Sequence, residues 1–343
     1  MIKQKKAKFM EVCGTHTFAI AKFGIKSIYS ETINFLSGPG CPVCVTSQED
    51  IDYIIELAKN KNNIIVSFGD MIRVPSGNLK MSLEKLPQDN IKIIYSVGEV
   101  LNIAYNNSSK NVIFIAVGFE TTSPLIASIV SEAKEKKRKN FFIFAALKTI
   151  IPAIDFLLRS KQINVDGFIL PGHVCSVTGY KPFEFIVKKY NIACTVAGFN
   201  HTNLKTAIDK LYEMHINKNY KLINCYTPVV SECGNITAQD IVNKVFEKDD
   251  AVWRGLGNIK ESGLKLNKNY NMFNILNIFK KTDKKQISQN TCICGKLFTG
   301  KYKPTDCSNF AKKCTPVTPI GPCMVSSEGV CASYYKYGEE NDK

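Results

Sequence analysis

The chain has 343 residues, of which 45% are hydrophobic and 22% are charged, a composition typical of a globular protein with room for more than one domain. Its net charge of +15 suggests nucleic-acid binding, but the densest lysine runs, at 134–139 and 280–285, contain no interleaved aromatic residues. We therefore expect solvated surface at both runs and no nucleic-acid partner. No apolar stretch follows the basic N-terminus, and the most apolar region, 141–158, is short and interrupted. This predicts no membrane association and a cytoplasmic location.

Short apolar runs alternate with helical patterns through most of the chain. Strand-like runs occur at residues 64–68, 91–97, 112–117, 141–146, 167–170 and 192–197. Helical periodicity occurs at residues 51–58, 99–106, 124–137, 150–159, 182–189 and 204–216. Near-continuous apolar strands that alternate with helices are typical of parallel sheets covered on both faces. The sequence therefore predicts two parallel-sheet α/β domains, at 1–147 and 148–252.

The character of the sequence changes at Trp253. A lysine- and asparagine-rich stretch leads to a tail at 291–337 that is rich in cysteine, proline and glycine and shows little periodicity. Such a tail cannot bury a large core and needs metal to hold it together. We expect a small, irregular C-terminal domain at 253–343.

The chain contains thirteen cysteines and no secretory signal, a combination that points to metal binding or redox chemistry more than to structural disulfides. Cys41 and Cys44 form a CxxC pair in GPGCPVC, at a predicted junction of loop and helix. Such a pair binds a metal or closes a disulfide. A further thiol, Cys13, lies upstream, and His16 follows it as a possible metal ligand, acid/base group or core histidine.

Polar residues follow three of the predicted strands directly. They are Asp70, Glu120 and His173. Because sites in parallel α/β sheets lie beyond the carboxyl ends of the strands, we expect these residues to share one rim with Cys41 and Cys44. Each residue taken singly also fits a turn or helix cap. The remaining isolated histidines and cysteines are interpreted as structural: His201, His215, Cys175, Cys194, Cys225 and Cys233.

The tail carries six more cysteines. They are Cys292, Cys294, Cys307, Cys314, Cys323 and Cys331. Four of them could hold an iron–sulfur cluster and leave two as a thiol pair. Structural zinc also takes four cysteines, but its usual paired CxxC knuckles are missing from the tail. Spacing does not decide which four would bind, and the evenly spaced set Cys307, Cys314, Cys323 and Cys331 competes with sets that include Cys292.

Seven motifs in the same order give the chain a resemblance to the HypD family of hydrogenase maturation factors over essentially its whole length. They are MEVCGTHT at 10–17, GPGCPVCVT at 38–46, GDMIRVP at 69–75, GFETT at 118–122, PGHV at 171–174, WRGLG at 253–257 with SGL at 262–264, and GPCMVSSEG at 321–329. Cys175 departs from the family pattern as we judge it, because a small serine-type residue is expected there.

The resemblance implies a scaffold that assembles the Fe(CN)2CO unit of NiFe-hydrogenases. Its implied partners are a HypC-type chaperone, HypE as the cyanide donor and, indirectly, the hydrogenase large subunit. By similarity, Cys13 would hold the iron, and Cys41 and Cys44 would be a redox pair that faces it across a cleft between the domains. The implied ligands of a C-terminal 4Fe-4S cluster are Cys292, Cys307, Cys314 and Cys331, beside a thiol pair formed by Cys294 and Cys323.

His16, Asp70 and Glu120 are expected to deprotonate thiols or supply protons at the iron. The first alternative function is a stand-alone, cluster-driven thiol–disulfide oxidoreductase, in which Cys13 would be incidental. A zinc-containing nucleic-acid binder is the second alternative, and the missing interleaving of basic and aromatic residues counts against it.

Overall fold

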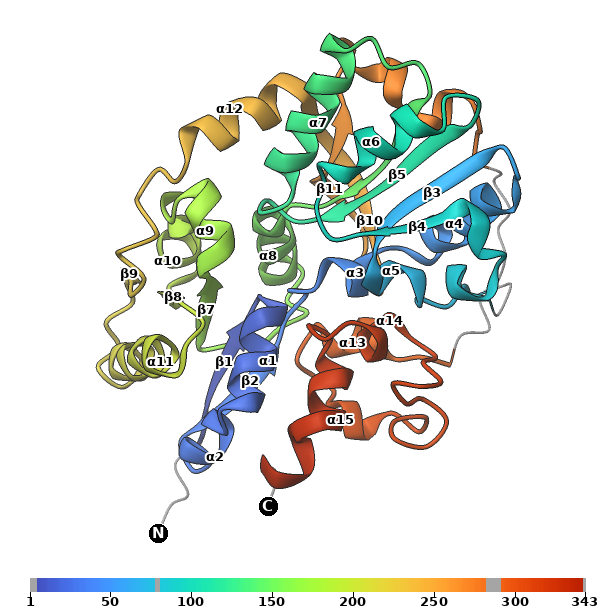
Figure 1. Ribbon diagram of the computed structural model, residues 1–343. Coiled ribbons are helices and arrows are strands. Elements are labelled where there is room, and N and C mark those ends of the chain that lie inside the picture. The colour runs from blue at the N-terminus through green and yellow to red at the C-terminus, as the bar shows by residue number, and fades with distance from the viewer. Residues whose placement is uncertain (1–4, 78–80, 282–290, 342–343) are drawn as a thin grey trace.

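The computed structural model describes residues 5–77, 81–281 and 291–341 (Figure 1). Two parallel β-sheets with helices around them, an antiparallel hairpin and a C-terminal segment of short helices make up the described chain. The predicted α/β class with parallel sheets is confirmed. Within the described ranges, no helix is both long and apolar enough to cross a membrane.

The first sheet has the strand order β2-β1-β7-β8-β9, and all its pairings are parallel. Its strands are β1 (Ala7–Glu11), β2 (Ile33–Ser37), β7 (Gly167–Pro171), β8 (Ala193–Ala197) and β9 (Leu222–Asn224). The helices that follow these strands or cover this sheet are α1 (Gly14–Lys22), α2 (Ile25–Ile28), α9 (Gly172–Thr178), the 3-10 turn η3 (Lys181–Phe183), α10 (Glu184–Tyr190) and α11 (His201–Ile216). One core cluster joins Phe9 and Ile169 of the sheet to Leu204 and Leu211 of α11.

The second sheet has the order β4-β3-β5-β6 and is also parallel. Its strands are β3 (Asn63–Phe68), β4 (Ile91–Ile94), β5 (Asn111–Gly118) and β6 (Phe141–Leu147). The helical elements of this region are α3 (Pro42–Val45), α4 (Gln48–Lys59), α5 (Gly69–Ile72), η1 (Leu83–Lys85), η2 (Gln88–Asn90), α6 (Glu99–Asn106), α7 (Ser123–Glu135) and α8 (Ile150–Arg159). Every strand-like run predicted between residues 64 and 146 falls in this sheet.

The sheets do not follow the division expected near residue 148. β1 and β2 pair with each other, and β1 also pairs with β7, so that Met10 lies opposite both Leu36 and Phe168. A boundary at 148 would separate β1 from this neighbour. Neither β1 nor β2 was predicted from the sequence, because Lys8 and Asn34 interrupt their short apolar runs and each strand ends on a polar residue.

A hairpin that the sequence interpretation missed follows the first sheet. α12 (Ile236–Val245) leads into β10 (Phe246–Trp253), which pairs antiparallel with β11 (Gly257–Leu266). Trp253 is fully buried, and its indole N–H donates to Ser262 Oγ at 2.8 Å. The hairpin packs against α8 and β6 and so supports the second sheet. Two 3-10 turns follow it, η4 (Asn271–Phe273) and η5 (Ile275–Asn277).

The C-terminal segment is mostly irregular, as expected, but it ends in a helix that the sequence interpretation missed. Its elements are α13 (Cys294–Leu297), η6 (Pro304–Asp306), α14 (Pro322–Val325) and α15 (Val330–Asn341). α15 packs against α1 and α14 packs against α3, so the segment lies along both (red in Figure 1). Of the two lysine-rich runs, 134–139 is largely exposed as expected, whereas residues 282–285 lie outside the described residues.

Candidate functional site

Cys13 lies where β1 passes into α1, at the N-cap of that helix. Glu11 fixes the turn, because its two carboxylate oxygens accept from the Cys13 backbone N–H at 3.2 Å and from Thr17 Oγ1 at 2.5 Å. Burial raises the pKa of Glu11 to about 8. The Cys13 thiol is itself buried, and this burial, followed by the charge of Glu328, raises its pKa to about 12.

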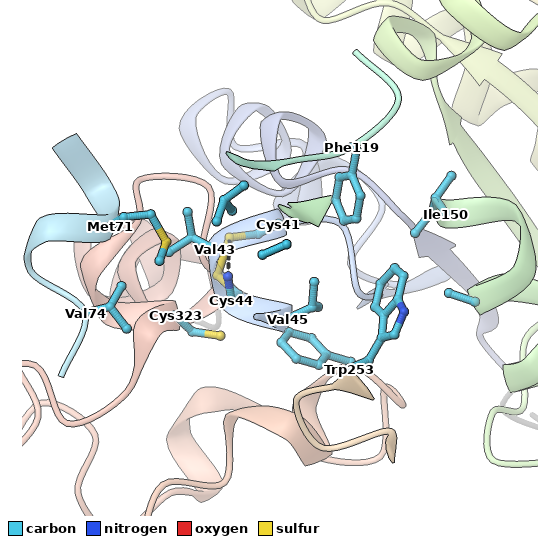
Figure 2. Packing of buried hydrophobic residues seen from close by; sticks show 14 of the residues in the cluster. Cys41, Val43, Cys44, Val45, Met71, Val74, Phe119, Ile150, Trp253 and Cys323 are labelled. Carbon is cyan, nitrogen blue, oxygen red and sulfur yellow. Dashed lines mark hydrogen bonds between the residues drawn. A yellow bond between two sulfur atoms is a disulfide. The ribbon is translucent and has the colours of Figure 1, made fainter. Parts of the chain in front are cut away.

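The backbone of the turn that leads into the CxxC pair contacts the backbone at Cys13. A Cβ atom on Gly40 would lie 2.3 Å from the Cys13 backbone nitrogen, and the Gly14 N–H donates to the Gly40 carbonyl at 2.9 Å. Cys41 is the N-cap of α3 and is joined to Cys44 by a disulfide, with a Cα–Cα distance of 5.3 Å. Figure 2 shows this pair within an apolar cluster, with Cys323 close to Cys44.

Two histidines at the carboxyl edge of the first sheet stack on the ring of Phe199. The His16 and Phe199 centroids lie 4.6 Å apart, and those of His173 and Phe199 lie 3.7 Å apart. His16 Nε2 lies 3.1 Å from the Gly198 carbonyl, which can only accept, so Nε2 carries the proton and Nδ1 is left buried without a partner in the described chain. Burial lowers the pKa of His16 to about 4, so the ring is neutral at physiological pH.

Glu120 and Asp70 follow strands of the second sheet. One oxygen of Glu120 accepts from the Ile150 backbone N–H at 2.8 Å, and the other is buried without a partner among the described residues. Burial raises the pKa of Glu120 to about 7. Burial also raises the pKa of Cys175, and the charges of Glu120 and then Cys13 add to this effect. The groups that the sequence analysis placed on one rim thus come from two sheets. α3 contacts β5 of the second sheet, and Gly40, just before α3, contacts Cys13 after β1 of the first.

Glu328 is a site residue that the sequence analysis missed. It accepts from Thr15 Oγ1 at 2.7 Å, and a Cβ atom on Gly14 would lie 2.4 Å from the Glu328 Cβ. Asp70 acts electrostatically on Glu328, whose pKa is raised by burial and then by Asp70. Glu328 lies in the motif at 321–329, but nothing local to that motif reveals its approach to α1.

The six C-terminal thiols interact with one another. Cys292 hydrogen-bonds with Cys294, and Cys294 with Cys323. Cys314 Sγ accepts from the Ile320 N–H at 3.3 Å. Burial raises the pKa of Cys331, and the charges of four other thiols add to it, namely Cys292, Cys294, Cys314 and Cys307. In the described chain, no three His, Cys, Asp or Glu side chains are gathered to hold a single metal ion.

The fold and the site together define a cysteine-rich α/β protein in which a CxxC turn lies between a buried upstream thiol and a group of C-terminal thiols. The HypD family model, described as the hydrogenase formation hypA family, matches residues 1–338. The hydrogenase maturation factor HypD of Escherichia coli is 36% identical over 99% of this chain and 91% of its own length. A Methanocaldococcus jannaschii protein whose name refers to hydrogenase expression and formation is 40% identical over 98% of this chain and 93% of its own.

HypD of Cupriavidus necator is 36% identical over 98% of this chain and 91% of its own length. The chain belongs to the HypD family, and its role is in hydrogenase maturation.

Proposed function

We propose that this chain is the scaffold and redox component that assembles the Fe(CN)2CO unit of NiFe-hydrogenase, together with a HypC-type chaperone and with HypE as the cyanide donor. The observation that supports this most is the position of the CxxC turn. Gly40 contacts the backbone of Cys13 on one side, and α14 with Cys323 packs on α3. The thiol proposed to hold the iron cargo thus has the Cys41–Cys44 disulfide, a pair that can be reduced and reoxidised, as its neighbour.

In this proposal, the Cys13 sulfur binds the iron that is being built up. The buried thiol keeps its proton until a cation replaces it, since its pKa is raised to about 12. Glu120 can hold or release a proton near neutral pH, because its pKa is raised to about 7. His16 is neutral, and its unpartnered Nδ1 can accept a hydrogen bond. Asp70 and His173 are the other two polar residues that we include in this site.

By the family resemblance, Cys292, Cys307, Cys314 and Cys331 would hold a 4Fe-4S cluster, and all four are free thiols, the donor type that such a cluster takes. When bound, such a cluster supplies single electrons. Cys294 and Cys323 share a hydrogen bond and form the neighbouring pair. Their thiols would reduce the Cys41–Cys44 disulfide by exchange, so that one disulfide forms as the other breaks and two protons move with the electrons.

The test is to co-express the chain with HypC and HypE, purify it without oxygen, and measure iron content and the infrared spectrum. We expect about four iron per chain from the cluster, with cyanide and CO bands in addition. Cys13→Ala should lose the bands and keep the cluster iron. Cys233→Ala, which removes an exposed free thiol, should keep both.

Bands that persist in Cys13→Ala would refute the assignment of the iron to that thiol. Zinc in place of iron, with no bands, would refute the scaffold as a whole. Reduction of external disulfides at an unchanged rate without HypC, again with no bands, would favour the stand-alone oxidoreductase.

A further inference from the structure

β2 is an edge strand of the first sheet, because it pairs with β1 and has no strand on its other side in the described chain (Figure 1). The Ala7 N–H donates to the Thr32 carbonyl at 2.9 Å, and the Gly38 N–H donates to the Glu11 carbonyl at 2.8 Å. Backbone groups alternate in direction along a strand, so the even-numbered residues of β2 bond to β1. The odd-numbered residues turn their N–H and C=O groups away from β1. They are Ile33, Phe35 and Ser37.

The outward groups of β2 are available to a further strand. Only the first of them is used locally, since the Ile33 N–H donates to the Tyr29 carbonyl at 2.8 Å. Among the described residues, no backbone hydrogen bond joins the Phe35 N–H, the Phe35 carbonyl or the Ser37 N–H to another element. An edge of this kind can pair with an added strand from another chain.

Two adjoining cavities, of about 620 and 470 Å³, lie along this edge. Each of the five residues of β2 lines one or both of them. The C-terminal segment lines the second cavity and comes close to the strand, because a Cβ atom on Gly300 would lie 2.9 Å from Leu36 Cδ1. The two cavities share Asn34, Phe35, Lys303 and Tyr334. Together they form one groove, the β2 groove, that follows the strand.

The β2 groove is strongly basic. Glu31 and Asp306 are its carboxylates, and Asp306 already accepts from the Lys303 backbone N–H at 2.7 Å. Among the described residues, only one of the lysines in the groove has a partner, Lys26, whose ammonium lies 3.9 Å from the Tyr334 ring centroid; the others form no ion pair. Six lysines line the groove: Lys5, Lys6, Lys8, Lys26, Lys301 and Lys303.

We propose that the β2 groove binds an acidic, extended segment of a partner polypeptide, which adds to β2 as a further strand of the first sheet. The strand edge supplies backbone hydrogen bonds, and the lysines select a segment that carries carboxylates. A nucleic-acid strand would meet the same lysines but has no peptide groups to pair with the edge. β2 leads into the turn that carries Cys41, so the bound partner would be held beside the CxxC region.

The first experiment separates strand pairing from charge attraction. A fluorescent peptide of alternating glutamate and valine is titrated with the full chain, purified without oxygen, and its fluorescence anisotropy is measured. The matched peptide has the same sequence and charge but carries methyl groups on its central backbone nitrogens, so it cannot pair through them. We expect the methylated peptide to bind about tenfold more weakly. Equal affinities of the two peptides would overturn strand addition.

The second experiment tests the lysines. Lys6→Glu combined with Lys303→Glu should weaken binding of the unmethylated peptide about tenfold or more. Lys61→Glu combined with Lys248→Glu changes the net charge equally at exposed lysines elsewhere and should leave binding unchanged. Both double variants should keep the circular dichroism spectrum of the unsubstituted chain.

Three results would contradict the proposal at this stage. Equal weakening by both double variants would mean that only the overall charge matters. Tighter binding of single-stranded RNA than of the peptide would identify a nucleic-acid surface instead. No binding of the unmethylated peptide by the unsubstituted chain would mean that the lysines only shield the strand edge from other chains.

Discussion

Two buried carboxyl groups near the site differ in what their oxygens do. Both oxygens of Glu11 accept hydrogen bonds within the turn that carries Cys13. This carboxyl group therefore stabilises the backbone of the turn. Glu120 uses one oxygen to cap Ile150 and leaves the other buried without a partner among the described residues. A free oxygen on a group that titrates near pH 7 is available for proton transfer. Glu120 is therefore the better candidate for an acid/base role.

Substituting Glu120 with Gln should make stability less dependent on pH. The folded state holds the proton up to about pH 7, whereas the unfolded chain releases it near 4.5, so wild-type stability falls as pH rises between these values. Gln keeps the acceptor for Ile150 and has no proton to lose. Relative to wild type, the variant should gain stability from pH 5 to pH 7, by about 3 kcal/mol at most. Urea unfolding under anaerobic conditions across this range measures the gain.

Glu132→Gln is the control for this comparison, because Glu132 is an exposed partner in a helical ion pair with Lys136. It should show no such trend. A difference between Glu120→Gln and wild type that is constant with pH would contradict the assigned titration. Lower maturation by a well-folded Glu120→Gln, with its cluster intact, would support the proton-transfer role.

The residues that the sequence revealed are those whose chemistry shows in a local motif. Cys13, Cys41 and Cys44 belong to this kind, as do the polar residues that directly follow apolar strands. Phe199, Arg254 and Glu328 were missed, because each acts through a contact with a distant segment. Phe199 stacks on the rings of His16 and His173, Arg254 donates to Thr46 and Gln48, and Glu328 accepts from Thr15. No local pattern encodes such a contact.

At the scale of elements, strand recognition followed hydrophobicity. β3, β5 and β8 are nearly continuous apolar runs and were predicted, whereas β1 and β2 carry polar residues and were missed. β1 is also the strand that carries Cys13 to the site, and its pairing with β7 is nonlocal. The pairing of β1 with β7 therefore could not be read from the sequence, even though most individual elements could.

The close packing of α3 against the turn between β1 and α1 depends on Gly40. Gly40→Ala would place a Cβ atom 2.3 Å from the Cys13 nitrogen and 2.5 Å from its Cα, both of them backbone atoms that cannot move aside cheaply. We expect the CxxC turn to be displaced and the infrared bands of the co-expressed complex to fall at least tenfold, while cluster iron is retained.

Gly98→Ala provides the comparison for this substitution, since its nearest neighbour would be Ser96 Oγ at an ordinary 3.8 Å. It should leave the bands unchanged. Full bands in Gly40→Ala would mean that the contact between the two turns is dispensable for assembly.

At the scale of the whole molecule, the parts differ in how they are held together. One face of the first sheet packs with α11, and one face of the second sheet packs with α6 and α7. Both of these core clusters are made without C-terminal residues. The segment 291–341 instead contributes its buried cysteines to the central cluster, and it has one helix longer than a single turn, α15. If sulfur ligation holds this segment, its order depends on metal, whereas the order of the sheets does not.

Removing the proposed cluster should therefore loosen this segment selectively. Hydrogen exchange, followed by mass spectrometry before and after anaerobic iron chelation, should show at least tenfold faster exchange in peptides from 291–341. Peptides covering β5 and β8 should stay protected, because one face of each strand lies in a core cluster that contains no residue of this segment. Cys292→Ala, purified without chelation, should reproduce the chelated pattern, and Cys233→Ala should reproduce the loaded one. Equal acceleration in the sheets and the segment would mean that the molecule folds as one unit around the metal.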